Sequence, residues 1–218
     1  VMILVDGSYV VGNFDGHTFY TLAGKPAVTD DRVRSLVIQG DYYATMTWHN
    51  IPSDRRVQIT WMSCHKPYPG MLFNQQMTVP SELTLHPTED GPLLRMNPIQ
   101  ELETLRIRSY EWTDVTLKQS DNPLSDIESD LLDLEIEFEP SVGTETLFEI
   151  RGFKVVYDSE SQTLSSCGTL AELPPVAGLI RLRILLDRTS VEVYGNDGRV
   201  YIPHVIFPGD DDRSVRAI

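Results

Sequence analysis

Cysteine is scarce in this sequence: Cys64 and Cys167 are the only two in 218 residues, and they lie far apart. One disulfide and two free thiols are both compatible with that count, and the spacing does not resemble a metal site. The histidines are equally scattered: His17, His49, His65, His86 and His204. Because no HExxH or paired-ligand pattern is present, we expect no metal site, and neither a phosphate-loop nor a GxSxG motif is found.

Positive charge is also in short supply. The chain has 18 Lys and Arg against 32 Asp and Glu, which gives a net charge of -14 and a pI near 4.6. This balance argues against a nucleic-acid partner and against an anionic membrane surface, and no apolar run reaches the length of a membrane span. A neutral ligand such as a sugar is compatible with it.

Helical periodicity is almost absent, and the only helical window is IQELETL within 93–105, which Pro98 limits to a turn or two. Short strands separated by turns fill the rest, apart from an irregular connection over 21–39 that contains Asp30 and Asp31. The predicted strands are 2–5, 8–12, 17–20, 41–48, 56–62, 76–85, 109–118, 131–138, 145–150, 152–157, 162–166, 180–186, 189–194 and 199–206. This pattern predicts an all-β chain with a β-sandwich in its second half.

The hairpin formed by 41–48 and 56–62 carries two of the three tryptophans, Trp48 and Trp61. Trp48, at a strand end before His49 and Asn50, is a candidate stacking wall for a sugar ring. For Trp61, inside an alternating strand, we favour core packing.

Among the charged residues, Asp41 has two open interpretations: the edge of a site, or a cap at the strand end. The pair Arg55-Arg56 is expected in a solvated turn. Asp187 and Asp197 occupy turn positions where Asp is favoured for backbone reasons. Glu192 alternates with valines and is expected to face solvent. No catalytic constellation follows from these residues.

Several stretches, in this order, resemble the end of glycoside hydrolase family 32, the β-fructosidases. They are YVVGNFDGHTF (9–19), GDYYATMTW (40–48), RRVQITWM (55–62), QMTVPSELTL (76–85), LLRMNPIQELETLR (93–106) and LRILLDRTSVEVYGNDGRVYI (182–202). The resemblance implies the last strands of a five-bladed β-propeller over 1–80 and a C-terminal β-sandwich over 81–218. It also implies retaining hydrolysis of β-fructosidic bonds in sucrose, inulin or levan, without a metal or organic cofactor.

The family places its three catalytic acids in Asn-Asp-Pro-Asn-Gly, Arg-Asp-Pro and Glu-Cys motifs, and none of the three is found in this sequence. The start, VMILVDGSYVVGNFDG, predicts strand–turn–strand without a leader, so we expect a portion of a longer protein that begins after the general acid and ends early. No residue of this chain is assigned a catalytic role. By the resemblance, Trp48 is the best candidate for contact with fructose, and Asp41 and Tyr43 are further candidates.

The resemblance also sets expectations about partners and location. A propeller fragment leaves open strand edges and an uncovered apolar face, so we expect either the missing N-terminal propeller part or self-association. Family members are often secreted or periplasmic. The alternative function is a carbohydrate-binding or oligomerisation sandwich that uses Trp112, Tyr194 and Tyr201, although core packing is the interpretation we favour for these three rings.

Overall fold

The computed structural model describes residues 1–27, 34–35, 37, 40–209 and 212–218, and within them the protein is built from antiparallel strands. Residues 28–33, 36 and 38–39 of the expected irregular connection, with Asp30 and Asp31, lie outside the described residues. Helical structure in the described part consists of the short 3-10 turns η2 (Pro52–Asp54) and η3 (Gln100–Leu105). None of the described helices is long and apolar enough to cross a membrane. The predicted all-β class is confirmed.

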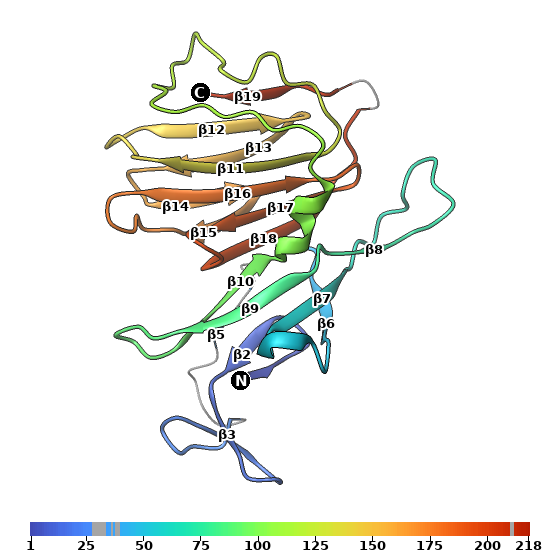
Figure 1. Ribbon diagram of the computed structural model, residues 1–218, viewed down its shortest axis with the longest axis vertical. Coiled ribbons are helices and arrows are strands. Elements are labelled where there is room, and N and C mark those ends of the chain that lie inside the picture. Colours follow the sequence, from blue (N-terminus) through green and yellow to red (C-terminus); the bar gives the residue numbers. More distant parts are fainter. Residues whose placement is uncertain (28–33, 36, 38–39, 210–211) are drawn as a thin grey trace.

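The N-terminal sheets occupy the lower half of Figure 1 and are formed by strands β1 to β10. Three strands form one sheet in the order β1 (Met2–Ile3), β2 (Ser8–Val10) and β5 (Arg34–Ser35), and β3 (Gly12–Phe14) pairs with β4 (Phe19–Thr21). The larger sheet has the order β10 (Leu93–Pro98), β9 (Ser81–His86), β7 (Arg56–Met62) and β6 (Tyr43–Thr47), with β8 (Gln76–Met77) also on β7. The predicted hairpin of 41–62 is therefore confirmed as β6 and β7.

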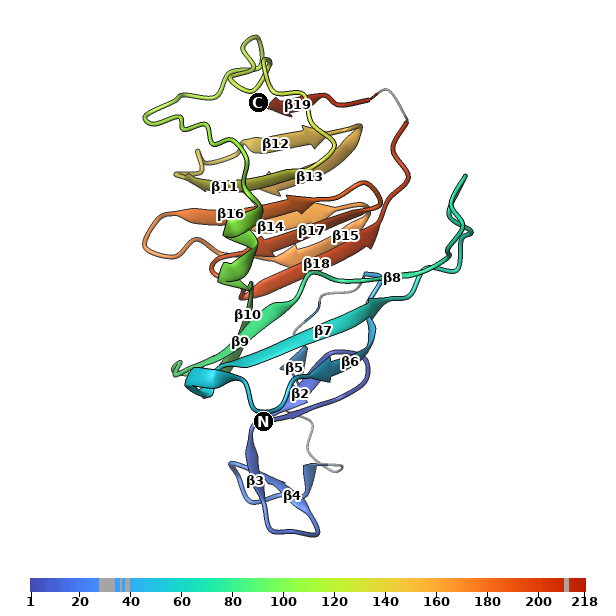
Figure 2. The same ribbon diagram turned by 45° about the vertical axis from the view of Figure 1, so that its right-hand side comes forward.

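The C-terminal sandwich stands above these sheets (Figures 1 and 2) and consists of two sheets face to face. One sheet has the order β11 (Leu132–Phe138), β16 (Ile180–Leu186), β17 (Ser190–Gly195) and β18 (Val200–Val205). The other has the order β15 (Thr169–Glu172), β14 (Thr163–Ser166), β13 (Phe153–Asp158), β12 (Glu145–Ile150) and β19 (Val215–Ala217). The predicted tight turns at 187–190 and 196–198 join β16, β17 and β18, as expected.

Alternate residues of facing strands fill the sandwich core, because successive side chains of a strand point to opposite faces. Val191 and Val193 of β17 point into this core together with Ile184 and Ile202 of the neighbouring strands. The residues of opposite parity on β17 are buried as well, so both faces of this strand are covered. The second cover comes from the N-terminal sheets.

A second apolar cluster lies between the N-terminal sheets and the sandwich, and we call it the junction cluster. Its members are Tyr9, Val37, Tyr42, Leu83, Leu94, Met96, Leu185, Tyr194 and Tyr201. Hydrogen bonds close its edge, since the N–H of Met96 donates to the carbonyl of Gly198 at 3.0 Å and the Asn97 amide donates to the carbonyl of Asp197 at 3.0 Å. The two halves of the chain therefore share a continuous buried contact.

The strand pairings also bear on the division of the chain. β9 and β10 pair with each other and β9 pairs with β7, so one sheet continues through Pro98. The boundary at residue 80 stays a prediction. The strand pairing favours a different division, in which the first unit runs to Pro98 and η3 begins the connection to the sandwich. Pro80 separates β8 from β9 within the single strand predicted over 76–85 because it has no N–H to donate to a ladder.

One further expectation is corrected by the structure. Residues 109–118, predicted as a strand, form no strand, because they run outside both sheets without a neighbouring strand to supply hydrogen bonds. The helical window IQELETL, limited by Pro98 to a turn or two, is confirmed as η3, and the residues before it form the strand β10.

Candidate functional site

Asp41, a candidate for substrate contact, is placed where the N-terminal sheets meet the sandwich. Its carboxylate accepts the backbone N–H of Val205 at 2.7 Å, and its own N–H donates to the carbonyl of Pro203 at 3.0 Å. The Nδ1 atom of His204 lies 3.9 Å from the same carboxylate. Burial lowers the pKa of His204 despite the opposing effect of Asp41, which favours a neutral imidazole. Asp41 thus fastens the start of β6 to β18.

Tyr43 begins β6 and is 45% exposed. Its ring meets the ring of Trp61 edge to face, with centroids 6.1 Å apart and planes at 74°. The indole N–H of Trp61 donates to the side chain of Gln75 at 2.9 Å. Trp61, expected in a core, is only partly buried, because it lies on a sheet face covered by Tyr43 and Gln75 instead of by a second layer.

Trp48 follows β6 at the far end of the strand from Tyr43 and is 42% exposed. Its carbonyl accepts a hydrogen bond from Arg56 at 3.3 Å, and its N–H donates to Val57, so the backbone is held by β7 while the indole stays accessible. Tyr43 and Trp48 are five positions apart, and an irregularity lies between them, since Ala44 has a φ of +56° and the pairing with β7 shifts register between Tyr43 and Met46. The two rings therefore offer separate contacts along the edge strand β6.

Arg55, expected in a solvated turn, is instead paired with two carboxylates. Its guanidinium donates to both oxygens of Glu101 at 2.7 and 3.1 Å, and to Glu82 at 2.9 Å. The hydrogen bonds from Arg55 lower the pKa of Glu101 to about 2. These ion pairs connect the turn after η2 to η3. The Arg55 guanidinium is therefore engaged in internal contacts and offers no anion site.

Glu192 was expected to face solvent, and this prediction is wrong, because the residue is only 1% exposed. The carboxylate accepts hydrogen bonds from the hydroxyls of Tyr201 at 2.5 Å and Tyr194 at 3.0 Å, and from the N–H of Val79 at 2.8 Å. Burial raises the pKa of Glu192 to about 7, against the lowering effect of these hydrogen bonds. This carboxylate is therefore an internal hydrogen-bond acceptor of the junction, with almost no exposed surface.

The signal for this burial was present in the sequence. Tyr194 has the same parity as Glu192 on β17, and Tyr201 stands opposite Tyr194 on β18 with ring centroids 4.6 Å apart. Two tyrosines on a supposed solvent face indicate a covered face. The core-packing interpretation is confirmed for both tyrosines, whereas Trp112 lies outside both core clusters and is 44% exposed.

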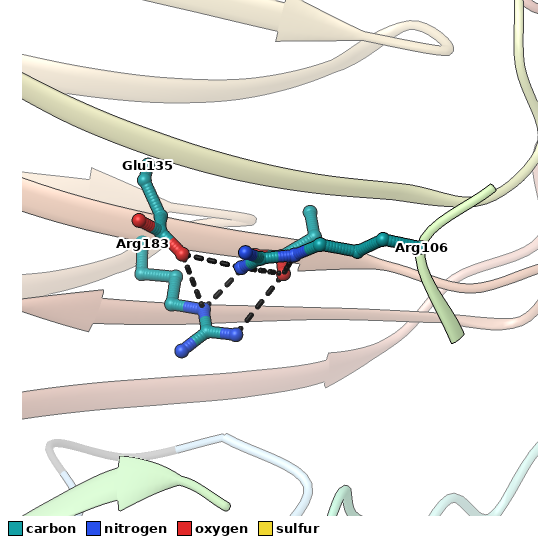
Figure 3. Close-up of polar contacts among 4 residues, drawn as sticks. Arg106, Glu135 and Arg183 are labelled. Atoms are coloured by element: carbon teal, nitrogen blue, oxygen red, sulfur yellow. Dashed lines mark hydrogen bonds and ion pairs between the residues drawn. The ribbon is translucent and has the colours of Figure 1, made fainter. Parts of the chain in front are cut away.

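A charged cluster on the sandwich was not foreseen from the sequence (Figure 3). Arg106, from the connection after η3, donates to Asp133 at 2.6 and 3.0 Å and also bonds Glu135 on β11. Arg183 of β16 donates to both oxygens of Asp133 at 2.9 and 3.0 Å. Burial of Asp133 works to raise its pKa, but the two arginines outweigh burial and hold the pKa below its ordinary value. The cluster anchors the connecting segment to the sheet.

No group of three or more His, Cys, Asp or Glu side chains in the described part of the chain is arranged to hold a metal ion. Asp187 and Asp197 lie in the turns flanking β17, and the carboxylate of Asp197 is 3.9 Å from Arg95. Of the acids considered from the sequence, Asp41 and Glu192 are thus engaged in the junction, and Asp187 and Asp197 lie in turns. What the arrangement offers to a ligand is aromatic: Trp48 and Tyr43 along β6, and Trp112 on the sandwich.

Comparison with known proteins defines the class. The profile of the C-terminal domain of glycosyl hydrolases family 32 matches residues 101–217, and the chain therefore belongs to this family. A levanase of Bacillus subtilis is 32% identical over 96% of this chain and 34% of its own length. An extracellular exo-inulinase of Aspergillus ficuum is 24% identical over 96% of this chain and 44% of its own.

The same fold is found in a solved structure. The crystal structure of an exo-inulinase from Aspergillus awamori superposes with a TM-score of 0.77, at 20% identity, over 96% of this chain and 46% of that one. This likeness agrees with propeller strands followed by a sandwich. The chain spans about a third of the levanase and less than half of the two inulinases.

Proposed function

We propose that this chain is the C-terminal portion of a β-fructosidase whose complete form hydrolyses β-fructosidic bonds in levan, inulin or sucrose. The observation that carries the proposal is the match of residues 101–217 to the family 32 C-terminal domain, together with 32% identity to a levanase along nearly the whole chain. The complete protein would follow the two-carboxylate chemistry of glycoside hydrolysis.

The 218-residue chain is proposed to be inactive by itself. Support comes from the sequence, which contains no Asn-Asp-Pro, Arg-Asp-Pro or Glu-Cys motif, and from the deep burial of Glu192. The test is fructose release from sucrose, inulin and levan by the purified chain, beside a complete levanase as positive control. We expect no release above the buffer blank. Release at a rate proportional to chain concentration would contradict the proposal.

In the complete enzyme we propose that Trp48 lines the substrate path and that Tyr43 and Asp41 are secondary contacts. Half-exposed indole on a rigid strand end suits stacking against a sugar, whereas the Asp41 carboxylate is already occupied by the Val205 N–H. In a complete enzyme carrying this chain, Trp48→Ala should raise the KM several-fold. Asp41→Asn should mainly lower thermal stability, and an unchanged KM for Trp48→Ala would contradict the assignment.

The partners of the chain are proposed to be a fructan or sucrose in the complete protein, and either the N-terminal propeller part or a second copy. Support comes from the arm between β7 and β8, which projects from the body in Figures 1 and 2 and exposes Met71, Leu72 and Phe73. Exposed apolar side chains of this kind favour association. Light scattering should show self-association of the isolated chain, and a monodisperse monomer would contradict this.

For location, the matched exo-inulinase of Aspergillus ficuum is extracellular. We propose that the complete protein is likewise secreted or periplasmic. Detection of its activity in culture medium or periplasmic extract, against a cytoplasmic marker enzyme, would test this.

A further inference from the structure

The segment from Ile107 to Leu117 carries two aromatic rings that lie against each other. Tyr110 and Trp112 are two positions apart in the sequence, and their side chains lie on the same side of the segment. Their ring centroids lie 5.9 Å apart with planes inclined by only 24°, so the rings are stacked. They are 57% and 44% exposed, and neither belongs to a core cluster. Each ring thus keeps a face that the other does not cover.

The stacked pair borders an open cavity of about 2800 Å³ between this segment and strand β11. Leu132 and Leu134 of β11, which also pack against the sandwich core, form part of its apolar lining. Polar groups are added by Glu128, Ser125 and Thr116. The cavity therefore combines flat aromatic surface with carboxylate and hydroxyl groups.

This combination suits a neutral oligosaccharide. The C–H faces of a sugar ring pack on aromatic rings, and its hydroxyls donate to carboxylates and exchange hydrogen bonds with Ser and Thr. The net charge of -14 disfavours an anionic polysaccharide. Ile107 on the same segment is 95% exposed, so an apolar protein surface is the competing occupant. An Ile107→Ala variant distinguishes the two, because it weakens a protein contact and leaves the aromatic rings in place.

We propose that Tyr110 and Trp112 form a sugar-binding platform on the sandwich, separate from Trp48, and that it holds a fructan chain. The identity of the sugar rests on the proposed function, whereas the platform rests on the geometry. Such a platform would keep a polymeric substrate near the enzyme without taking part in bond cleavage.

The test is affinity electrophoresis of the 218-residue chain in gels containing levan, inulin or dextran. We expect retardation by levan or inulin and none by dextran. Trp112→Ala and Tyr110→Ala should each weaken the apparent affinity at least tenfold, and Trp112→Phe should keep part of it because a ring remains. Two matched controls should bind like the unmodified chain: Phe14→Ala removes an exposed ring from β3 of the N-terminal sheets, and Ile107→Ala removes an exposed aliphatic group from the same segment. Circular dichroism verifies that each variant is folded.

The outcomes separate the platform from the proposed function. Absence of retardation, equal retardation by dextran, or loss of binding in Phe14→Ala or Ile107→Ala but not in Trp112→Ala would overturn the platform. If a complete enzyme carrying this chain fails to hydrolyse fructans while the isolated chain is still retarded through Trp112, the platform stands and the proposed function falls. If the complete enzyme hydrolyses fructans but the isolated chain is not retarded, the proposed function stands and the platform falls.

Discussion

The carboxylate of Glu192 accepts the backbone N–H of Val79 at 2.8 Å, although the two residues are 113 positions apart in sequence. Val79 precedes β9 of the N-terminal sheets and Glu192 lies on β17 of the sandwich. Nearby, the Gln76 amide donates to the carbonyl of Thr189 at 3.1 Å. The contact between the two halves of the chain is therefore fixed by polar groups inside an apolar cluster.

Glu192 should make stability depend on pH. Burial raises its pKa to about 7 in the folded protein, above the ordinary value of 4.5, so the folded state holds the proton more tightly than the unfolded chain. The stability contributed by this proton is complete below pH 4.5 and is lost as the pH rises through 7. The difference corresponds to about 3 kcal/mol. Urea unfolding between pH 4.5 and 8 should show the loss in the unmodified chain and a flatter profile in Glu192→Gln.

Glu192→Ala serves as the contrasting variant. It leaves the Tyr194 and Tyr201 hydroxyls and the Val79 N–H without their shared acceptor, and it opens a cavity in the junction cluster. We expect a loss of about 2–4 kcal/mol at pH 5, where Glu192→Gln should cost less than half as much. Equal losses, or a pH profile unchanged in Glu192→Gln, would contradict the role given to this carboxylate.

The close approach at Gly198 should be equally sensitive. A Cβ there would lie 2.2 Å from the carbonyl oxygen of Met96, and the residue has a φ of +77°. Gly178 has a similar φ of +84° but open space around its Cα, which makes it the matched control. Gly178→Ala should cost about 1 kcal/mol from backbone strain alone. Gly198→Ala should lower the free energy of unfolding by at least about 2 kcal/mol more than Gly178→Ala does. Similar losses for the two variants would show that the backbone around Met96 can shift to accept a Cβ at little cost.

Much of the fold could be predicted because tight turns and alternation are local signals. The hairpin of β6 and β7 and the run from β16 to β18 were found from β-branched residues and from the turns at 187–190 and 196–198. A local sequence pattern does not show which element covers each face of a strand or which strand pairs with each of its edges. Glu192 alternates like a surface residue, but the N-terminal sheets cover its face, and residues 109–118, predicted as a strand, have no strand beside them.

The surroundings of the candidate site residues could be predicted only in part for the same reason. Exposed aromatic character at Trp48 could be predicted from its place at a strand end, and the structure leaves this ring 42% exposed. The hydrogen bond from Val205 to Asp41 and the pairing of Arg106 with Asp133 join positions far apart in sequence, which a single sequence does not reveal. The stacking of Tyr110 on Trp112 likewise required coordinates, because the segment departs from its predicted strand.

Asp133 should be the critical member of the charged cluster in Figure 3. It receives hydrogen bonds from Arg106 and Arg183 and is largely buried, so Asp133→Asn would leave the two guanidinium groups with only the more exposed Glu135 as a shared anion. We expect a loss of about 1–3 kcal/mol in denaturant unfolding at pH 7. The matched control is Glu137→Gln on the same strand, which breaks the more exposed pair with Arg181 and should cost less than about 0.5 kcal/mol. A smaller loss for Asp133→Asn than for Glu137→Gln would contradict this ranking.

The two thiols should differ in reactivity. Both cysteines are free, but Cys64 is buried beside the Lys66 backbone whereas Cys167 is exposed in the turn between β14 and β15. A thiol reagent needs an accessible sulfur, so titration of the native chain should detect Cys167 first, although burial raises the pKa of its thiol and slows the reaction, and denaturant should release the second thiol. Cys167→Ser should remove the fast reaction, and Cys64→Ser should leave it unchanged. No reactive thiol under denaturing, non-reducing conditions would instead indicate a disulfide, and two fast native thiols would show that Cys64 is not enclosed.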